Sequence, residues 1–402
     1  MQPAPYILEL KGARDMRRRI YELLGTLALV CCAAALVCFP KETVEAASSG
    51  LELCLNVIIP SLFPFFVISA LAVDLGLAER MGRLVEPVMR RLFNVSGACA
   101  SAFVLGFVGG YPVGARTAIA LYERGECSRR EAERLLSFCN NSGPAFILGV
   151  VGASVFADNR VGLLLYLVHG LASVITGVCF RRWRGGRDSS RPRLQQGRKL
   201  RPGFAEAFTG GVKNSFASTL NICGFVIFFT VLIKMLVMSG VLPAAAKGVA
   251  LLLRPLGVDE DTARRLLIGV IEMSSGVWSL SAAAESLSTG AAMAAFILGW
   301  AGISVHCQTL SFLCDSGLSA KTYIIGKLMH GVLSAALVWL AFRLLPFEEA
   351  AAAYLARQVS GIAQLNFAAA LSISGVCALI MVILLIIFAF IGEKRVEKRG
   401  EL

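Results

Sequence analysis

Long apolar segments separated by short charged ones make up most of the chain. Crossing the hydrocarbon core of a bilayer takes roughly 20 helical residues, and eight segments reach that length. These segments are residues 20–39, 51–75, 135–157, 161–180, 215–239, 290–314, 322–345 and 366–392. The pattern predicts an all-α polytopic membrane protein, because a helix satisfies its own backbone hydrogen bonds inside lipid.

Two further apolar segments, residues 98–122 and 262–282, are interrupted near their centres. Gly110, Pro112 and Gly114 interrupt the first; proline removes a helix donor and glycine loosens the backbone. We expect a re-entrant hairpin, two half-helices joined by a turn, in each segment. The alternative for residues 98–122 is one complete crossing.

The distribution of positive charge decides between these models. Residues 181–201 carry nine Lys or Arg, and further basic clusters occupy residues 11–19 and 394–399. Basic loops remain on the cytoplasmic side, and the hairpin model places all three clusters there. Residues 79–93 interleave Arg with Leu and Met, which is typical of an amphipathic helix at the membrane surface. Residues 20–39 exceed the apolar core of a secretory signal, so we expect an uncleaved anchor.

Four stretches of the sequence recur 150 to 163 residues later. The recurring pairs are residues 65–66 and 228–229, 92–106 and 255–269, 145–155 and 295–305, and 169–173 and 330–334. A duplicated unit of three spans and one hairpin crosses the membrane an odd number of times, so its second copy must insert upside down. Inverted repeats of this kind are typical of secondary carriers.

The repeat and the charge clusters divide the chain into five regions. We expect two inverted repeats, each with three spans and a re-entrant hairpin, and one extra span at each end. The regions are an N-terminal cytoplasmic segment with its anchor helix (1–50), a first repeat (51–180), a basic cytoplasmic linker (181–203), a second repeat (204–346), and a C-terminal helix with a basic tail (347–402).

Composition narrows the function classes. The net charge of +12 is explained by basic cytoplasmic loops and does not indicate a nucleic-acid surface. No phosphate loop, paired carboxylates or nucleophile–base pair is apparent, so we expect no enzymatic activity and no cofactor beyond a coupling proton or cation. His306, Cys307 and Cys314 form only a weak metal motif because no fourth ligand lies near them, and we predict no metal site.

Irregular backbone at membrane depth is tolerated only where it is buried in protein or lines a wet cavity. Residues 109–114, 140–144 and 272–276 are the three irregular places. Half-helix N-termini there would present unpaired N–H groups and a positive dipole end to an anion; alternatively, Gly and Pro only kink packed helices. We favour binding. The predicted substrate-binding residues are Gly110, Tyr111, Pro112, Gly114, Asn140, Asn141, Gly143, Glu272, Ser274, Ser275 and Gln308.

Glu272 is the costliest residue of the membrane part, because a carboxylate at mid-bilayer costs roughly 2.5–3.5 kcal/mol. It is a candidate coupler of protons or cations, or a wall of the binding site; a capping contact within its own hairpin is the structural alternative. For His306, a buried hydrogen-bonded role competes with substrate contact. His169 and His330 are each followed by Gly, so we expect an interhelical hydrogen bond at a close helix contact.

Three motifs resemble the sporulation integral membrane protein family of the YlbJ type, whose halves are similar to the nucleoside-recognition (Gate) domain. They are residues 110–115 (GYPVGA), 135–144 (LLSFCNNSGP) and 302–308 (GISVHCQ). The resemblance covers roughly residues 50–345. The family's tip and Asn-Asn-x-Gly-Pro motifs fall here on Gly110, Tyr111, Pro112, Gly114, Asn140, Asn141, Gly143 and Pro144.

The resemblance implies a carrier-like fold related to concentrative nucleoside transporters, in a membrane of an endospore-forming bacterium. It also implies a role in moving dipicolinate from the mother cell toward the forespore, and thus a location in the membrane facing the mother cell around the forespore. The leading hypothesis is a secondary carrier of a small organic anion. The alternatives are a nucleoside or nucleobase carrier, and a non-transporting membrane assembly factor for spore maturation. The expected partners are a small anionic substrate and the lipid bilayer, without nucleic acid; a homo-oligomer is left open.

Overall fold

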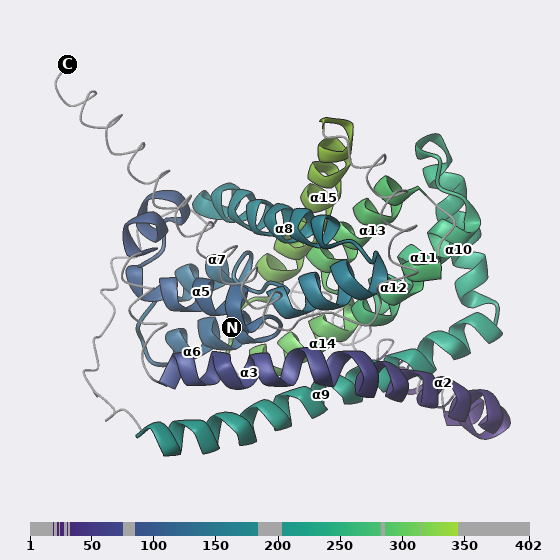
Figure 1. Ribbon diagram of the computed structural model, residues 1–402, viewed down its shortest axis with the longest axis horizontal. Helices are drawn as coiled ribbons and strands as arrows, with labels where there is room; N and C mark the ends of the chain where they lie inside the picture. The colour runs from purple at the N-terminus through teal and green to yellow at the C-terminus, as the bar shows by residue number, and fades with distance from the viewer. Residues whose placement is uncertain are drawn as a thin grey trace, which may run out of the picture.

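The computed structural model describes residues 33–74, 85–183, 203–282, 286–314 and 316–344, with scattered positions between 19 and 30 (Figure 1). All regular elements of this part of the chain are helices, as the apolar pattern predicts. Among the described residues, five helical stretches are long and apolar enough to cross a membrane: Pro40–Ile68, Asn159–Arg182, Phe204–Met238, Leu287–Leu313 and Ala320–Leu344. The predicted span 366–392, the linker 184–202 and most of the first apolar run lie outside the described residues.

One side of the molecule is formed by two long helical segments (Figure 1). The first runs continuously through α2 (Pro40–Leu53), the π-helical turn η1 (Cys54–Ile58) and α3 (Ile59–Asp74). The second is α9 (Phe204–Met238), which lies along it. Gly50 allows the close approach, because a Cβ there would come 3.1 Å from the Cα of Ile227.

Two helical hairpins form where the sequence predicts them. The first joins α5 (Ala100–Gly109) to α6 (Val113–Glu123), and the second joins α11 (Glu260–Ile271) to α12 (Met273–Ser279). The arms of each hairpin cross at paired glycines, Gly106 with Gly114 and Gly269 with Gly276. A Cβ on Gly114 would lie 2.9 Å from the Cα of Gly106, and one on Gly276 would overlap the Cα of Gly269.

The predicted span 135–157 is interrupted near residues 140–144, as the sequence pattern predicts. Helix α7 (Arg129–Leu136) ends at the beginning of this span, residues 137–143 are irregular, and the π-helix η4 (Ala145–Val155) follows. The reason is local, because Gly and Pro interrupt the segment and Asn141 donates a side-chain hydrogen bond to the carbonyl of Phe138, which competes with helical bonding.

The predicted span 290–314 is also broken. Helices α13 (Leu287–Trp300) and α14 (Gly302–Leu313) meet at Ala301 and Gly302, which have φ angles of 80° and 75°. The sequence likeness of the two AFILG stretches suggested that they occupy equivalent places in the fold. They do not. The first builds η4 after its break, whereas the second spans the end of α13, its break and the start of α14.

The remaining elements complete the bundle. Helices α8 (Asn159–Cys179) and α15 (Ala320–Leu344) lie side by side, and α13 packs along α15. The shorter elements are η2 (Met89–Phe93), η3 (Gly97–Cys99), η5 (Phe180–Arg182), α10 (Val241–Leu253), η6 (Arg254–Leu256) and η7 (Leu280–Ala282). Residues 85–93 belong to the predicted surface helix 79–93 and are helical.

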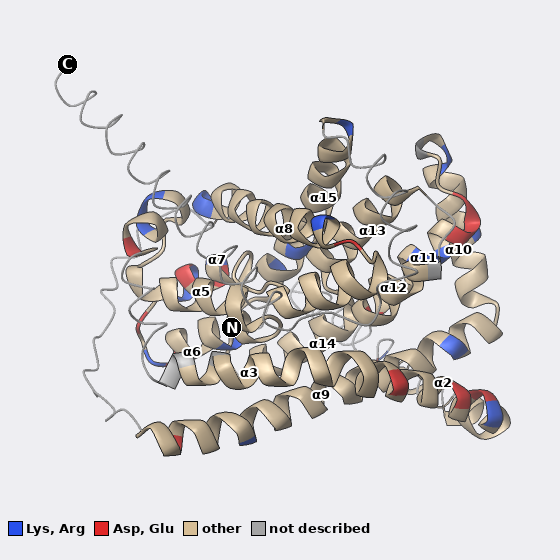
Figure 2. Ribbon diagram, viewed as in Figure 1, with Lys and Arg blue, Asp and Glu red and all other residues tan. Residues whose placement is uncertain are grey.

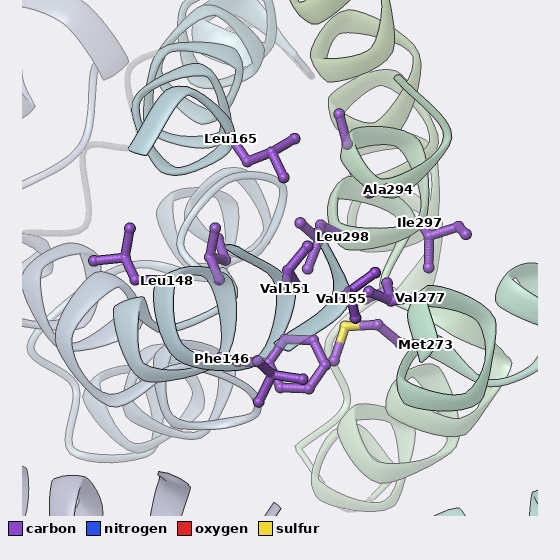
Figure 3. Close-up of a cluster of buried hydrophobic side chains, with 14 of the residues drawn as sticks. Phe146, Leu148, Val151, Val155, Leu165, Met273, Val277, Ala294, Ile297 and Leu298 are labelled. Carbon is purple, nitrogen blue, oxygen red and sulfur yellow. The ribbon is translucent and has the colours of Figure 1, made fainter. Parts of the chain in front are cut away.

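The central core joins the two halves of the chain. Phe146, Val151 and Val155 from η4 meet Val277 from α12 and Leu298 from α13 (Figure 3). Most charged residues lie instead at helix ends and around the periphery (Figure 2). The burial of apolar side chains between η4, α12 and α13 fixes the second hairpin against the first half of the chain.

Candidate functional site

A cavity of about 40 Å³ lies between the tips of the two hairpins. Gly110 and Tyr111 of the first tip, and Glu272, Met273 and Ser274 of the second, contribute to its wall. The irregular segment before η4 contributes Ser142 and Gly143, and α14 contributes Val305 and Gln308. Apolar side chains of η1, α3 and α9 complete the lining.

Each hairpin tip packs against a helix break in the same half of the chain. A Cβ on Gly143 would come 3.2 Å from the Cα of Gly110, and one on Gly302 would come 2.8 Å from the backbone nitrogen of Met273. The glycines at the breaks therefore permit backbone-to-backbone contact, which brings irregular segments from distant parts of the sequence to one place.

Six of the predicted binding residues border the cavity: Gly110, Tyr111, Gly143, Glu272, Ser274 and Gln308. Gln308 is buried, and its side-chain oxygen has no hydrogen-bond partner among the described residues. A buried polar atom without a partner is rare in proteins. Gln308 therefore offers a free hydrogen-bond acceptor at this wall.

The other predicted residues do not border the cavity. Pro112 lies just past the tip and forms the N-cap of α6. Gly114 serves the crossing of the hairpin arms, and Ser275 lies 3.2 Å from the hydroxyl of Thr230 on α9. These three positions support the shape of the hairpins.

The two asparagines of the break are buried and bind protein groups. The side-chain oxygen of Asn140 accepts a hydrogen bond from the Ala115 N–H at 3.4 Å, and its amide nitrogen donates to the hydroxyl of Thr309 at 3.2 Å. Asn141 donates to Phe138 and to the hydroxyl of Ser173. Neither side chain borders the cavity, because the break uses these amides to satisfy its own buried polar groups. Their contact with a substrate stays a prediction.

Glu272 caps the helix that it precedes. Its carboxylate accepts hydrogen bonds from the N–H groups of Ser274 at 3.0 Å and Ser275 at 2.5 Å, and from the hydroxyl of Ser304 at 3.4 Å. The capping contact within its own hairpin, which was the structural alternative for Glu272, is thus present. The expectation of unpaired N–H groups at the start of α12 is wrong, because the carboxylate of the same hairpin occupies them.

Lys327 is not among the residues predicted from the sequence. This residue of α15 is fully buried, and its ammonium nitrogen lies 2.8 Å from the hydroxyl oxygen of Tyr111, 2.9 Å from the carbonyl oxygen of Asn140 and 3.2 Å from Nδ1 of His330. It lies near the start of a predicted span, where a lysine ordinarily extends to the membrane surface. A lysine in an apolar segment was the available signal, and only its burial distinguishes it from that ordinary case.

The paired histidines connect α8 to α15, as predicted. The His169 and His330 rings lie 4.3 Å apart between centroids, and Nε2 of His330 lies 3.0 Å from the carbonyl oxygen of His169. Nε2 of His169 accepts a hydrogen bond from the N–H of Ser142 in the cavity wall. His306 is buried with Nδ1 3.0 Å from the hydroxyl of Tyr323, whereas Cys307 and Cys314 are exposed.

The chain is similar in sequence to known proteins. A family model described as nucleoside recognition matches residues 55–158. The chain is 32% identical over 335 residues to the sporulation integral membrane protein YlbJ of Bacillus subtilis (strain 168), and the match covers 77% of this chain and 80% of that protein.

Solved structures share the fold at lower identity. CNTnw in an inward-facing substrate-bound state is 13% identical with a TM-score of 0.54, covering 83% of this chain and 86% of that chain. A CNTnw variant in an intermediate state is 15% identical with a TM-score of 0.56, covering 83% and 87%. The architecture is therefore similar to the concentrative nucleoside transporter fold.

Proposed function

The chain belongs to the sporulation integral membrane protein YlbJ family and has a membrane-transporter-like fold. On that premise, we propose that it is a secondary carrier of a small organic anion, and that this anion is dipicolinate during endospore formation. Its location is then the membrane facing the mother cell around the forespore.

The buried amino group of Lys327 behind the cavity wall carries this proposal, in which it bears a positive charge. Lys327 donates to the hydroxyl of Tyr111, a residue of the wall, and its nitrogen lies 4.9 Å from the centre of the Tyr111 ring. Within the described part of the chain, Lys327 forms no ion pair with a carboxylate. In a medium of low dielectric constant such a charge attracts an anion strongly.

Glu272 supplies the coupling in this proposal. Its carboxylate borders the same cavity, and two negative groups in one low-dielectric site repel each other. A proton on Glu272 removes that repulsion, so an anion and a proton bind together. Uptake should accordingly increase as the external pH falls.

The small size of the cavity favours alternating access. A water molecule needs roughly 10–15 Å³ of such space, so 40 Å³ holds a few waters and is too small for an aromatic ring with two carboxylates. We propose that the two halves are inverted repeats whose movement relative to each other opens the cavity to one side at a time. Gly110, Tyr111, Gly143, Ser274 and Gln308 would then contact the substrate.

Uptake into liposomes tests the function directly. Purified protein in liposomes should accumulate radiolabelled dipicolinate, and an excess of unlabelled dipicolinate should compete whereas uridine or adenosine should not. Competition by nucleosides would support the nucleoside carrier instead. Absence of binding and uptake of both classes would leave the assembly-factor hypothesis.

Gln308 separates a binding role from a packing role. Gln308→Leu retains the bulk of the side chain and removes its amide, whose N–H groups are the donors that a carboxylate can accept from. Dipicolinate affinity should fall by roughly tenfold or more, as expected for a lost hydrogen bond to a charged group, while thermal stability stays unchanged or rises. Unchanged affinity would exclude Gln308 from the site.

A further inference from the structure

The hydrogen bonds around Lys327 determine its charge. Tyr111 donates its only hydroxyl proton to the carbonyl of Leu298 at 2.7 Å, so its oxygen accepts from Lys327. The carbonyl of Asn140 is also an acceptor. Because Nε2 of His330 must donate to the carbonyl of His169, its Nδ1 accepts from Lys327 when the imidazole is neutral. These three acceptors match the three donors of an ammonium group.

The alternative proton position leads to the same net charge. If Nδ1 of His330 carried the proton, Lys327 would be a neutral amine that accepts from an imidazolium. In both arrangements the Lys327–His330 pair holds one positive charge. The titratable groups around Lys327 are Tyr111, Cys139, His169, His306, Tyr323 and His330. None of these groups is a carboxylate.

The location of this charge is informative. Asn140 lies in the irregular segment between α7 and η4, and Tyr111 lies at the tip of the first hairpin. In carriers built from discontinuous helices, unwound backbone carbonyls of this kind coordinate the coupling sodium ion or proton. Here an ammonium group that belongs to the chain binds the carbonyl.

We propose that Lys327 is a built-in cation at this helix break, and that the protein therefore binds and transports its substrate without sodium. Replacing the side chain by a small neutral one would leave the Asn140 carbonyl, the Tyr111 hydroxyl oxygen and Nδ1 of His330 without their donor. Such a set of oxygen and nitrogen acceptors should then take up a free cation.

Cation rescue tests the proposal without any assumption about the substrate. The melting temperature of the purified protein is measured in sodium chloride, methylammonium chloride and choline chloride at equal ionic strength. The wild type should melt at the same temperature in all three. In choline chloride, Lys327→Ala should melt at a lower temperature than the wild type. In methylammonium or sodium chloride it should regain part of that loss, because these cations fit the space of the missing ammonium group and choline does not.

Lys321→Ala is the matched control, because Lys321 is an exposed residue of the same helix. It should melt like the wild type in every salt. A sodium-specific increase in the melting temperature of the wild type would overturn the proposal, since it would reveal a separate sodium site. Equal melting of Lys327→Ala in all three salts would overturn it as well. If Lys327→Ala does not fold, the wild-type comparison and Lys327→Arg, which keeps the charge and should remain insensitive to sodium, still decide.

The transport consequence rests on the proposed carrier function. Dipicolinate uptake by the wild type should be equal in sodium and choline buffers. Uptake that needs sodium would refute the built-in cation. Absence of uptake in both buffers would refute the carrier function and leave the melting result intact.

Discussion

The two hairpins share a backbone plan and differ in charge. Both cross at paired glycines, and both tips press against a glycine beside a helix break. The second tip carries its own anion, Glu272, which caps α12. The first tip carries no charged residue, but Tyr111 connects it to a cation on α15. Similar frames therefore place opposite charges on the two sides of one cavity.

This difference shows which part of such a site is local and which is assembled. Glu272 and its hydrogen-bond donors Ser274 and Ser275 lie within four consecutive residues, so the anion is stabilised as soon as the hairpin forms. Lys327 lies 216 residues from Tyr111 along the chain. The cation therefore reaches its partners only when the two halves of the protein pack together.

The largest effect is expected in the labelling of introduced cysteines, which tests whether the two hairpins enter the membrane from opposite sides. Single cysteines at Glu123, at the end of α6, and at Glu260, at the start of α11, mark the open ends of the two hairpins. Under the inverted-repeat proposal a membrane-impermeant maleimide added outside cells should label Glu260→Cys and spare Glu123→Cys until the membrane is permeabilised. Labelling of both from outside would rule out the inverted arrangement.

That experiment needs a background without reactive native thiols. Cys38, Cys179, Cys307 and Cys314 are the exposed cysteines of the described residues. Each would be replaced by serine, as would Cys31, Cys32 and Cys377, which lie outside the described residues. The background protein without an added cysteine serves as the control, and it should remain unlabelled on both sides.

The next largest effect concerns the glycine crossings. Gly114→Ala and Gly276→Ala should each destabilise the protein by about 1–3 kcal/mol or more. The added methyl group of the first would overlap the carbonyl oxygen of Cys139 and crowd Gly106, and that of the second would overlap the backbone of Gly269. The matched control is Gly149→Ala in η4, where nothing lies within 4 Å of the added Cβ. Thermal unfolding followed by tryptophan fluorescence measures the difference. If one hairpin tolerates the methyl group and the other does not, the common frame is disproved.

A smaller loss of stability is expected when the hydrogen bond that connects the first hairpin tip to α15 is removed. Tyr111→Phe removes the hydroxyl between Lys327 and the carbonyl of Leu298. The loss leaves one donor of a buried cation unpaired, which typically costs about 1–3 kcal/mol. Tyr122→Phe, on α6 away from the cavity, should change stability by less than roughly 0.5 kcal/mol. Equal melting temperatures for the two variants would mean that Tyr111 does not support Lys327.

The smallest effect on stability is expected at the caps, where pH dependence is the sharper measurement. Glu272→Gln retains one cap acceptor and removes the titratable group, so uptake should lose its increase at low pH while stability falls by about 1 kcal/mol. Asp259→Asn is the control, because Asp259 caps α11 through the N–H of Thr262 and does not border the cavity. Asparagine caps as well as aspartate, so both uptake and stability should be unchanged near neutral pH.

Asp259 itself cannot produce a pH response near neutrality. Its hydrogen bond with Thr262 lowers the pKa of the carboxyl below the ordinary aspartate value. A lowered folded-state pKa contributes stability that is present above the ordinary value of about 3.9 and is lost as the pH falls through the folded-state value. A pH response of uptake between about pH 5 and 8 that survives in Glu272→Gln would therefore point to a group other than these two caps, and it would contradict the coupling role of Glu272.

The helices, the two hairpins and the family can all be predicted from the amino-acid sequence. Apolar length and the positions of Gly and Pro act on the local backbone, and local backbone preference is what a sequence pattern records. The turn between α5 and α6 and the capped start of α12 follow from residues that are neighbours in the chain.

Which polar groups contact each other depends on the packing of distant segments. The amides of Asn140 and Asn141 turn into the protein, the two AFILG stretches occupy different places around their breaks, and Lys327 replaces an expected surface lysine with a buried cation. Each outcome depends on which distant segment packs against the residue. A buried polar group takes the partner that long-range packing brings to it, and the sequence pattern carries no record of that partner.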